Sequence, residues 1–167
     1  MSDDVWRAVD ENLETPCVRH SRSLLLCGLG RVVAGDEEGA QELFARSAEL
    51  EGTGQEPILD PLRLRLALVR GDRAEAARLV DAPIARPFVW GPSVEAVRLD
   101  AMAMLRQGER LELHAPTLAQ PGTYLEPFAL RALGIVRGDD PLVARAGALF
   151  AALGLDWHGA QTAALVA

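Results

Sequence analysis

The chain has 167 residues, of which 49% are hydrophobic and 25% are charged, and its formal net charge is −7. A chain of this length and composition forms one globular domain with its own core, so a largely disordered protein is excluded. All 17 basic residues are arginines scattered among acidic residues, which disfavours a nucleic-acid partner and excludes lysine as a nucleophile or phosphate-binding residue.

The N-terminal part of the chain predicts paired amphipathic helices. Residues 3–12 carry a short apolar stripe. Thr15 and Pro16 predict the start of a longer helix, because threonine caps helices and proline is tolerated in the first turn. Apolar residues then recur at helical spacing as far as Gly35, which predicts the helix end, and Asp36 is placed to cap the return helix.

A similar arrangement follows at Asp60–Pro61, which predicts a second helix start of the same kind. This helix is expected to run to Gly71 and to be followed by a return helix that ends near residue 80. Residues 81–92 contain three prolines and a glycine and therefore predict an irregular loop.

The C-terminal part predicts two more hairpins and a final helix. Ser93 is expected to begin the third hairpin, whose return helix should stop near Pro116. Thr123 and Glu126 have the spacing of a capping box before the fourth hairpin. Two further helix starts are predicted at Asp140–Pro141 and Asp156. Valine, isoleucine and threonine are sparse beside alanine and leucine, and no strand pattern is found, so the chain is predicted to be all-α.

Glycine–acid pairs mark the predicted reversals between helices. They are Gly35-Asp36, Gly71-Asp72, Gly108-Glu109 and Gly138-Asp139, separated by 36, 37 and 30 residues. This period is typical of stacked helical hairpins, each of which covers an apolar face of its neighbour. We predict one domain over residues 1–167, a short right-handed solenoid of antiparallel helix hairpins. Its predicted units are residues 16–51, 60–80, 93–115 and 123–153, with a terminal helix at 157–167.

The segment from Leu24 to Leu50 resembles a tetratricopeptide repeat. A small residue lies in the first helix, a glycine–acid pair forms the turn, and small and large residues follow at spacings used for close helix packing. The positions that carry the resemblance are Gly28, Gly35, Asp36, Ala40, Phe44 and Ser47.

Two longer stretches, Thr15 to Asp36 and Pro121 to His158, resemble the helical C-terminal region of bacterial multidomain adenylate/guanylate cyclases and related ATPase-containing transcriptional regulators. In that family the region is a regulatory or interaction module. The resemblance therefore implies a non-enzymatic scaffold that binds a protein or peptide partner in bacterial signalling or transcriptional regulation. It implies no cyclase, ATPase or DNA-binding activity. The rival hypothesis is a helical regulatory domain that holds a small ligand between hairpins.

Arginines on the first helices of the hairpins are candidate partner-binding residues. In tetratricopeptide solenoids these helices line the inner groove, where guanidinium groups would bind the carboxylates of a partner. The alternative is that they form ion pairs on solvated helix faces. The candidates are Arg19, Arg22, Arg63, Arg65, Arg98 and Arg131, with Trp90 in the predicted loop. Tyr124 and Trp157 are expected to fill the core or the seams between helices.

Cys17, His20 and Cys27 suggest a metal site. On one helix the two cysteines would lie about 15 Å apart, so they cannot bind the same ion. A half-site of Cys17 and His20, completed by His114 or His158, is the alternative, and Cys27 is expected in the core. No nucleotide-binding, zinc-protease or nucleophile-elbow motif is found, so we expect no catalytic residue, metal or cofactor.

Three features concern location and assembly. No apolar run approaches the roughly 18 residues that a membrane span needs, and the acidic N-terminus does not resemble a signal peptide. Two cysteines are too few for the disulfide framework of a secreted protein. We therefore expect a cytoplasmic protein without a membrane partner. The terminal repeats lack a polar outer cap, which leaves homo-oligomerisation through an exposed end open.

Overall fold

The computed structural model describes Arg7 and residues 18–51, 57–82 and 92–164. The regular structure of these residues is helical, as predicted, and they contain no strand. The predictions for Thr15–Pro16, for most of residues 3–12 and for positions 83–91 of the loop lie outside this part of the chain.

The contacts group the chain into two compact units, whereas the sequence predicted one domain. The first unit comprises Met1–Asp72 with Asp81–Ala85, and the second comprises Arg73–Val80 with Arg86–Ala167. The predicted hairpin 60–80 is therefore divided, because its two helices belong to different units.

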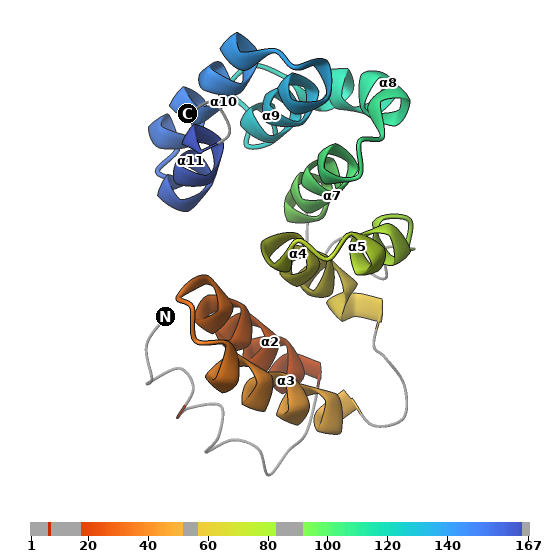
Figure 1. Ribbon diagram of the computed structural model, residues 1–167, viewed down its shortest axis with the longest axis vertical. Helices are drawn as coiled ribbons and strands as arrows, with labels where there is room; N and C mark the ends of the chain where they lie inside the picture. Colours follow the sequence, from red (N-terminus) through yellow and green to blue (C-terminus); the bar gives the residue numbers. More distant parts are fainter. Residues whose placement is uncertain (1–6, 8–17, 52–56, 83–91, 165–167) are drawn as a thin grey trace. The chain divides into compact units, whose positions relative to one another are not determined.

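The first unit is built on one antiparallel hairpin and a further helix (Figure 1). Its elements are α2 (Val18–Val33), α3 (Glu37–Glu51), the 3-10 turn η1 (Pro57–Leu59) and α4 (Asp60–Arg70). Both α3 and α4 pack on α2. A Cβ atom on Gly28 would lie only 2.8 Å from the Cδ1 and Cζ atoms of the Phe44 ring, which confirms the predicted close approach of α2 and α3. Cys27 lies in their apolar core, as expected.

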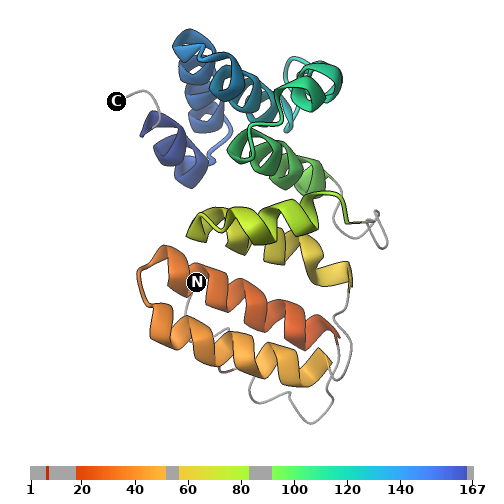
Figure 2. The same ribbon diagram turned by 45° about the vertical axis from the view of Figure 1, so that its right-hand side comes forward.

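In the second unit (Figure 2), helix α9 packs on the three helices α7, α8 and α10. The elements of this unit are α5 (Arg73–Val80), α7 (Pro92–Met104), α8 (Gly108–Leu118), α9 (Glu126–Arg137), α10 (Asp140–Ala152) and α11 (Asp156–Ala163). Helix α7 packs on α5, α8 and α9; α9 also packs on α8 and α10, and α11 packs on α10. Every residue from Glu126 to Gly134 is buried, so α9 has no open face along this length.

Five of the described helices, α2, α4, α7, α9 and α10, end in the same kind of turn. A residue with positive φ follows the helix, and the next N–H donates to the carbonyl five residues back, which is the Schellman geometry. The left-handed residues are Gly35, Gly71, Arg106, Gly138 and Gly154, with φ of 83°, 70°, 59°, 66° and 68°. The bonds of the following residues are Asp36 to Arg31, Asp72 to Ala67, Gln107 to Met102, Asp139 to Gly134 and Leu155 to Phe150, all between 2.8 and 2.9 Å.

The third reversal does not lie at the predicted glycine. Arg106 occupies the left-handed position, and Gly108 is the first residue of α8. The turn lies directly after α7, and Arg106, which is not a glycine, adopts the strained left-handed backbone there. Its side chain is also used: Nη1 of Arg106 donates to the carbonyl oxygen of Ile135 at 2.9 Å.

We expect replacement of Arg106 by glycine to stabilise the second unit relative to replacement by alanine. Both variants lose the bond to Ile135, but only glycine adopts positive φ without steric cost, which corresponds to about 1 kcal/mol. Urea unfolding followed by circular dichroism measures the difference. The matched control is Gly138→Ala, for which we expect a loss of similar size. An alanine variant at 106 as stable as the glycine variant would contradict the left-handed backbone.

Two aspartates that follow a left-handed glycine, Asp36 and Asp139, cap the next helix. Asp36 Oδ1 accepts from the N–H of Gly39 at 3.0 Å, as predicted for α3. Asp139 caps α10 by accepting from the N–H of Leu142 at 3.0 Å, and α10 begins at Asp140, as predicted.

The predicted helix starts at Asp60 and Asp156 are confirmed, because these are the first residues of α4 and α11. Their expected capping role is not, because the N-cap positions are Leu59 and Leu155, which make no side-chain cap bond. Thr123 and Glu126 form no capping box, because the threonine hydroxyl donates to the Gln120 carbonyl at 2.8 Å and the glutamate accepts from the N–H of Gly122 at 2.7 Å. Pro116 lies inside α8, which continues to Leu118.

The cap of α3 makes stability depend on pH. The hydrogen bond from Gly39 N–H, and then the bond from Arg31, lower the pKa of Asp36 below its ordinary value. A carboxylate with a depressed pKa stabilises the fold above its unfolded pKa, and this contribution is lost as pH falls through the folded pKa. Asp36→Asn keeps the cap acceptor but does not titrate.

We expect wild type to be more stable than Asp36→Asn at neutral pH and the two to converge below pH of about 3.9, the pKa of an unperturbed aspartate. Urea midpoints measured by circular dichroism across this range give the comparison. Parallel pH profiles for the two proteins would show that the charge of Asp36 contributes nothing.

Candidate functional site

Two of the predicted partner-binding arginines in the first unit differ sharply in environment. Arg19 on α2 is exposed. Arg63 on α4 is only 13% exposed in its side chain, and its guanidinium pairs with Glu51 of α3 and, at 2.9 Å, with Asp60 of α4. Arg63 is therefore engaged within the unit, and we remove it from the candidate set. Arg22 and Arg65 are half-buried and stay in it.

Glu51 extends the contacts of Arg63 into a buried hydroxyl pair. The Oγ atoms of Ser21 on α2 and Ser47 on α3 lie 2.7 Å apart, and both residues are fully buried. Glu51 Oε1 lies 3.0 Å from Ser21 Oγ and 3.3 Å from Ser47 Oγ, so it accepts from one hydroxyl while the other donates to its serine neighbour. Buried polar groups are costly unless they are hydrogen-bonded, so this network fixes how α2, α3 and α4 fit together.

Arg98 of the second unit lies on α7 beside Glu95, with 3.9 Å between the charged atoms. The same glutamate lies 3.2 Å from Nε2 of His114 on α8. The half-buried Arg98 therefore stays a candidate, in a surface ion pair of the kind that the alternative hypothesis expects.

Arg131 lies in the interior, contrary to its prediction as a partner-binding residue. It is 5% exposed. Nη2 donates to Asp100 Oδ1 at 2.7 Å, while Nη1 donates to Thr162 Oγ1 at 2.9 Å and to the His158 carbonyl at 3.3 Å. A buried guanidinium needs such acceptors. Arg131 lies in a helix, as predicted, but its side chain faces neighbouring helices and not solvent.

Asp100, Arg131 and Thr162 form a ladder through three helices. They lie on α7, α9 and α11, and each step spans 31 residues. Asp100 and Thr162 were not predicted as site residues. The equal spacing was a signal in the sequence, because equivalent positions of successive repeats contact each other in a stacked array.

Aromatic rings surround the guanidinium of this ladder. Its Cζ atom lies 4.6 Å from the ring centre of Phe150 and 5.5 Å from that of Phe128, within the range of cation–π attraction. The two phenylalanine rings are 4.8 Å apart in an edge-to-face arrangement. The His158 ring lies 4.8 Å from Phe128 and 5.3 Å from Phe150. We call Arg131, Phe128 and Phe150 the arginine–aromatic cluster.

No protein-family model, curated protein or solved structure matches this chain. The resemblances to tetratricopeptide repeats and to the cyclase region therefore stay predictions.

Tyr124 and Trp157 lie at the edge of the cluster and not in the core. Tyr124 is 40% exposed, and its ring centre lies 5.2 Å from that of Phe128. Trp157 is 36% exposed, and its ring centre lies 4.8 Å from that of His158. A core position is therefore wrong for both side chains, and the alternative, a place in a seam between helices, stays a prediction. Trp90 lies outside the described residues.

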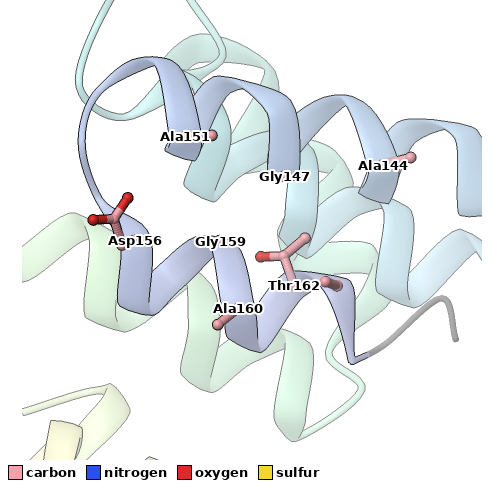
Figure 3. Close-up of a pocket in the computed structure, with 8 residues that line it drawn as sticks. Ala144, Gly147, Ala151, Asp156, Gly159, Ala160 and Thr162 are labelled. Carbon is pink, nitrogen blue, oxygen red and sulfur yellow. The ribbon is translucent and has the colours of Figure 1, made fainter.

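An open groove lies between α10 and α11 (Figure 3). Its volume is about 400 Å³. It is lined by Ala144, Gly147, Ala151, Asp156, Gly159, Ala160, Thr162 and Ala163. Alanine and glycine dominate this lining and Asp156 is its one carboxylate, so the groove is not the enclosed polar pocket that the small-ligand hypothesis requires.

In residues 18–51, 57–82 and 92–164, no group of three or more histidine, cysteine, aspartate or glutamate side chains is placed to hold a metal ion. Cys17 lies outside these ranges, so the half-site with His20 stays a prediction. Over the same described part of the chain, no helix has the length and apolar character to cross a bilayer.

Proposed function

We propose that this chain is a tetratricopeptide-like helical-repeat scaffold that binds a protein or peptide partner and is not an enzyme. The observation that carries the proposal is the 31-residue recurrence of Asp100, Arg131 and Thr162 on helices that contact each other. Repeated turns support it, because Gly35, Gly138 and three further residues take the same left-handed position. Stacked hairpins in a short right-handed solenoid account for both features.

The proposed partner is a segment that carries carboxylates. Arg19, Arg22, Arg65 and Arg98 lie on first helices and are exposed or half-buried, so a partner can reach their guanidinium groups and form charge-assisted bonds with them. A net charge of −7 makes nucleic acid a poor alternative. The resemblance to the cyclase region supports a role in bacterial signalling or transcriptional regulation, and we propose the cytoplasm as the location.

Selection of short peptides from a display library against the purified chain tests the proposal. We expect enriched peptides to be acidic and to bind the Arg19→Glu/Arg65→Glu variant at least tenfold more weakly, because each lost charge-assisted bond is worth about 1.5–3 kcal/mol. The matched control is Arg78→Glu/Arg110→Glu, which changes the net charge equally on return helices α5 and α8. We expect this control to bind nearly as wild type does.

Failure to enrich any peptide, or equal weakening by the two double variants, would contradict the proposal. Equal weakening would mean that only the net charge is sensed. Circular dichroism and urea midpoints of the variants exclude unfolding as the cause of lost binding.

A further inference from the structure

Helix α11 covers the arginine–aromatic cluster with a small set of contacts. Thr162 supplies a hydroxyl oxygen to Arg131, and His158 supplies a carbonyl oxygen to the same guanidinium. The His158 ring also contacts Phe128 and Phe150. Asp100 of α7 provides the counter-charge, so α11 contributes neutral acceptors and a ring.

The helix itself is weakly supported. It has eight residues, and Thr162 is the one buried residue among them, whereas α9 is buried without interruption from Glu126 to Gly134. Its start lacks a side-chain cap, and Gly159 lies in its interior. Helices of this length are marginal in water and depend on packing, so α11 is a candidate for local opening.

Helix α11 packs on α10, but the side chains at this contact are small. The open groove between the two helices is lined mainly by alanine and glycine (Figure 3). A Cβ atom on Gly147 would lie 3.6 Å from Thr162 Cγ2, which is ordinary contact distance, so the glycine leaves room at this point. Small side chains make few dispersion contacts. The polar contacts with Arg131 on α9 and the contacts of the His158 ring with Phe128 and Phe150 therefore add to this packing.

We propose that α11 is a displaceable cover, and that a helical segment of the partner takes its place on the arginine–aromatic cluster. This inference rests on the proposed function and specifies its regulation. The incoming segment presents what α11 presents: an oxygen acceptor for Nη1 of Arg131 and a planar ring for Phe128 and Phe150. Asp100 neutralises the guanidinium in both states, so this part of the partner needs no charge. Only molecules in which α11 has left the cluster bind the segment, so a small fraction of such molecules lowers the apparent affinity in proportion.

A disulfide that locks α11 provides the test. The Cβ position of Gly147 lies 3.9 Å from Cβ of Thr162, close to the mean separation of about 3.8 Å in disulfides. We use the double variant Gly147→Cys/Thr162→Cys with Cys17→Ser. The native Cys27 is buried, and burial raises the pKa of its thiol, which keeps it out of exchange. Glutathione disulfide forms the bond, and dithiothreitol provides the matched open control.

The probe is a fluorescein-labelled synthetic peptide with the sequence of residues 153–167, which carries the α11 contacts. We expect the reduced variant to bind the probe and the oxidised form to bind at least tenfold more weakly in fluorescence anisotropy. The single variant Thr162→Val weakens the contacts of the protein's own α11 and leaves the probe unchanged. We expect this variant to bind the probe more tightly than wild type does. A probe with the same Thr162→Val change should bind more weakly.

Equal binding by the oxidised and reduced forms, or no binding by either, would overturn the displaceable cover. Matching circular dichroism spectra of the two forms exclude misfolding. Acidic peptides from the display selection separate the two proposals. If they bind but ignore the lock, the scaffold function stands and the cover is wrong; if only the α11 probe responds, the cover stands and the proposed carboxylate-binding function is wrong.

Discussion

Replacing Arg131 by leucine is expected to lower the free energy of unfolding of the second unit by about 3–5 kcal/mol, because it breaks a buried ion pair by removing one partner. The change takes away the guanidinium that neutralises Asp100 at 2.7 Å. It also removes the donor to Thr162 and the contacts with the rings of Phe128 and Phe150.

Two further variants separate charge from shape. Arg131→Lys keeps the positive charge but cannot donate in two directions, since an ammonium lacks the planar fork; we expect an intermediate loss. Asp100→Leu/Arg131→Leu removes both charges, and buried pairs replaced by apolar residues are often neutral or more stable. The double variant should therefore be more stable than Arg131→Leu alone.

The double-mutant cycle consists of wild type, Asp100→Leu, Arg131→Leu and the double variant, whose urea unfolding is followed by circular dichroism. If the losses of Asp100→Leu and Arg131→Leu simply add, the two residues do not interact across α7 and α9. That result would also remove the ladder as support for stacked repeats.

The sequence predicted helices better than it predicted their ends. Glycine with a following aspartate was a reliable signal at Gly35 and Gly138, because glycine adopts positive φ and aspartate then caps. At the third reversal the glycine signal failed, since the turn lies at the end of α7 and Arg106 takes the strained position. The exact end of a helix depends on where its packing against other helices ends, and local residue preferences do not predict that position.

The candidate site was predictable as a set of helices but not as a set of exposed side chains. Arg131 lies on the expected helix, yet its exposure is decided by α11, which covers it from 31 residues away. Helical periodicity states which residues share a face, but it does not state which second helix covers that face. The equal spacing of Asp100, Arg131 and Thr162 held the missing information, because a repeated separation relates one helix to the next.

Gly134 on α9 is the glycine whose replacement by alanine should cost the most stability. A Cβ atom there would lie 2.6 Å from Val143 Cγ2, 3.0 Å from the Val143 nitrogen and 3.1 Å from the Asp139 carbonyl oxygen. Two of these atoms belong to the backbone at the start of α10, so rotation of a side chain cannot relieve the overlap. We expect Gly134→Ala to lose about 2–3 kcal/mol even though alanine favours helix by about 1 kcal/mol.

Gly147→Ala on α10 is the matched control, because the same added methyl group would meet Thr162 Cγ2 at 3.6 Å without overlap. We expect it to gain up to about 1 kcal/mol from helix propensity. Gly28→Ala should fall between the two, since the Phe44 ring that it meets is a side chain and is able to shift. Urea midpoints rank the three variants. If Gly134→Ala were as stable as Gly147→Ala, the backbones of α9 and α10 would lie farther apart than described here. That result would contradict the close packing of the α9–α10 hairpin.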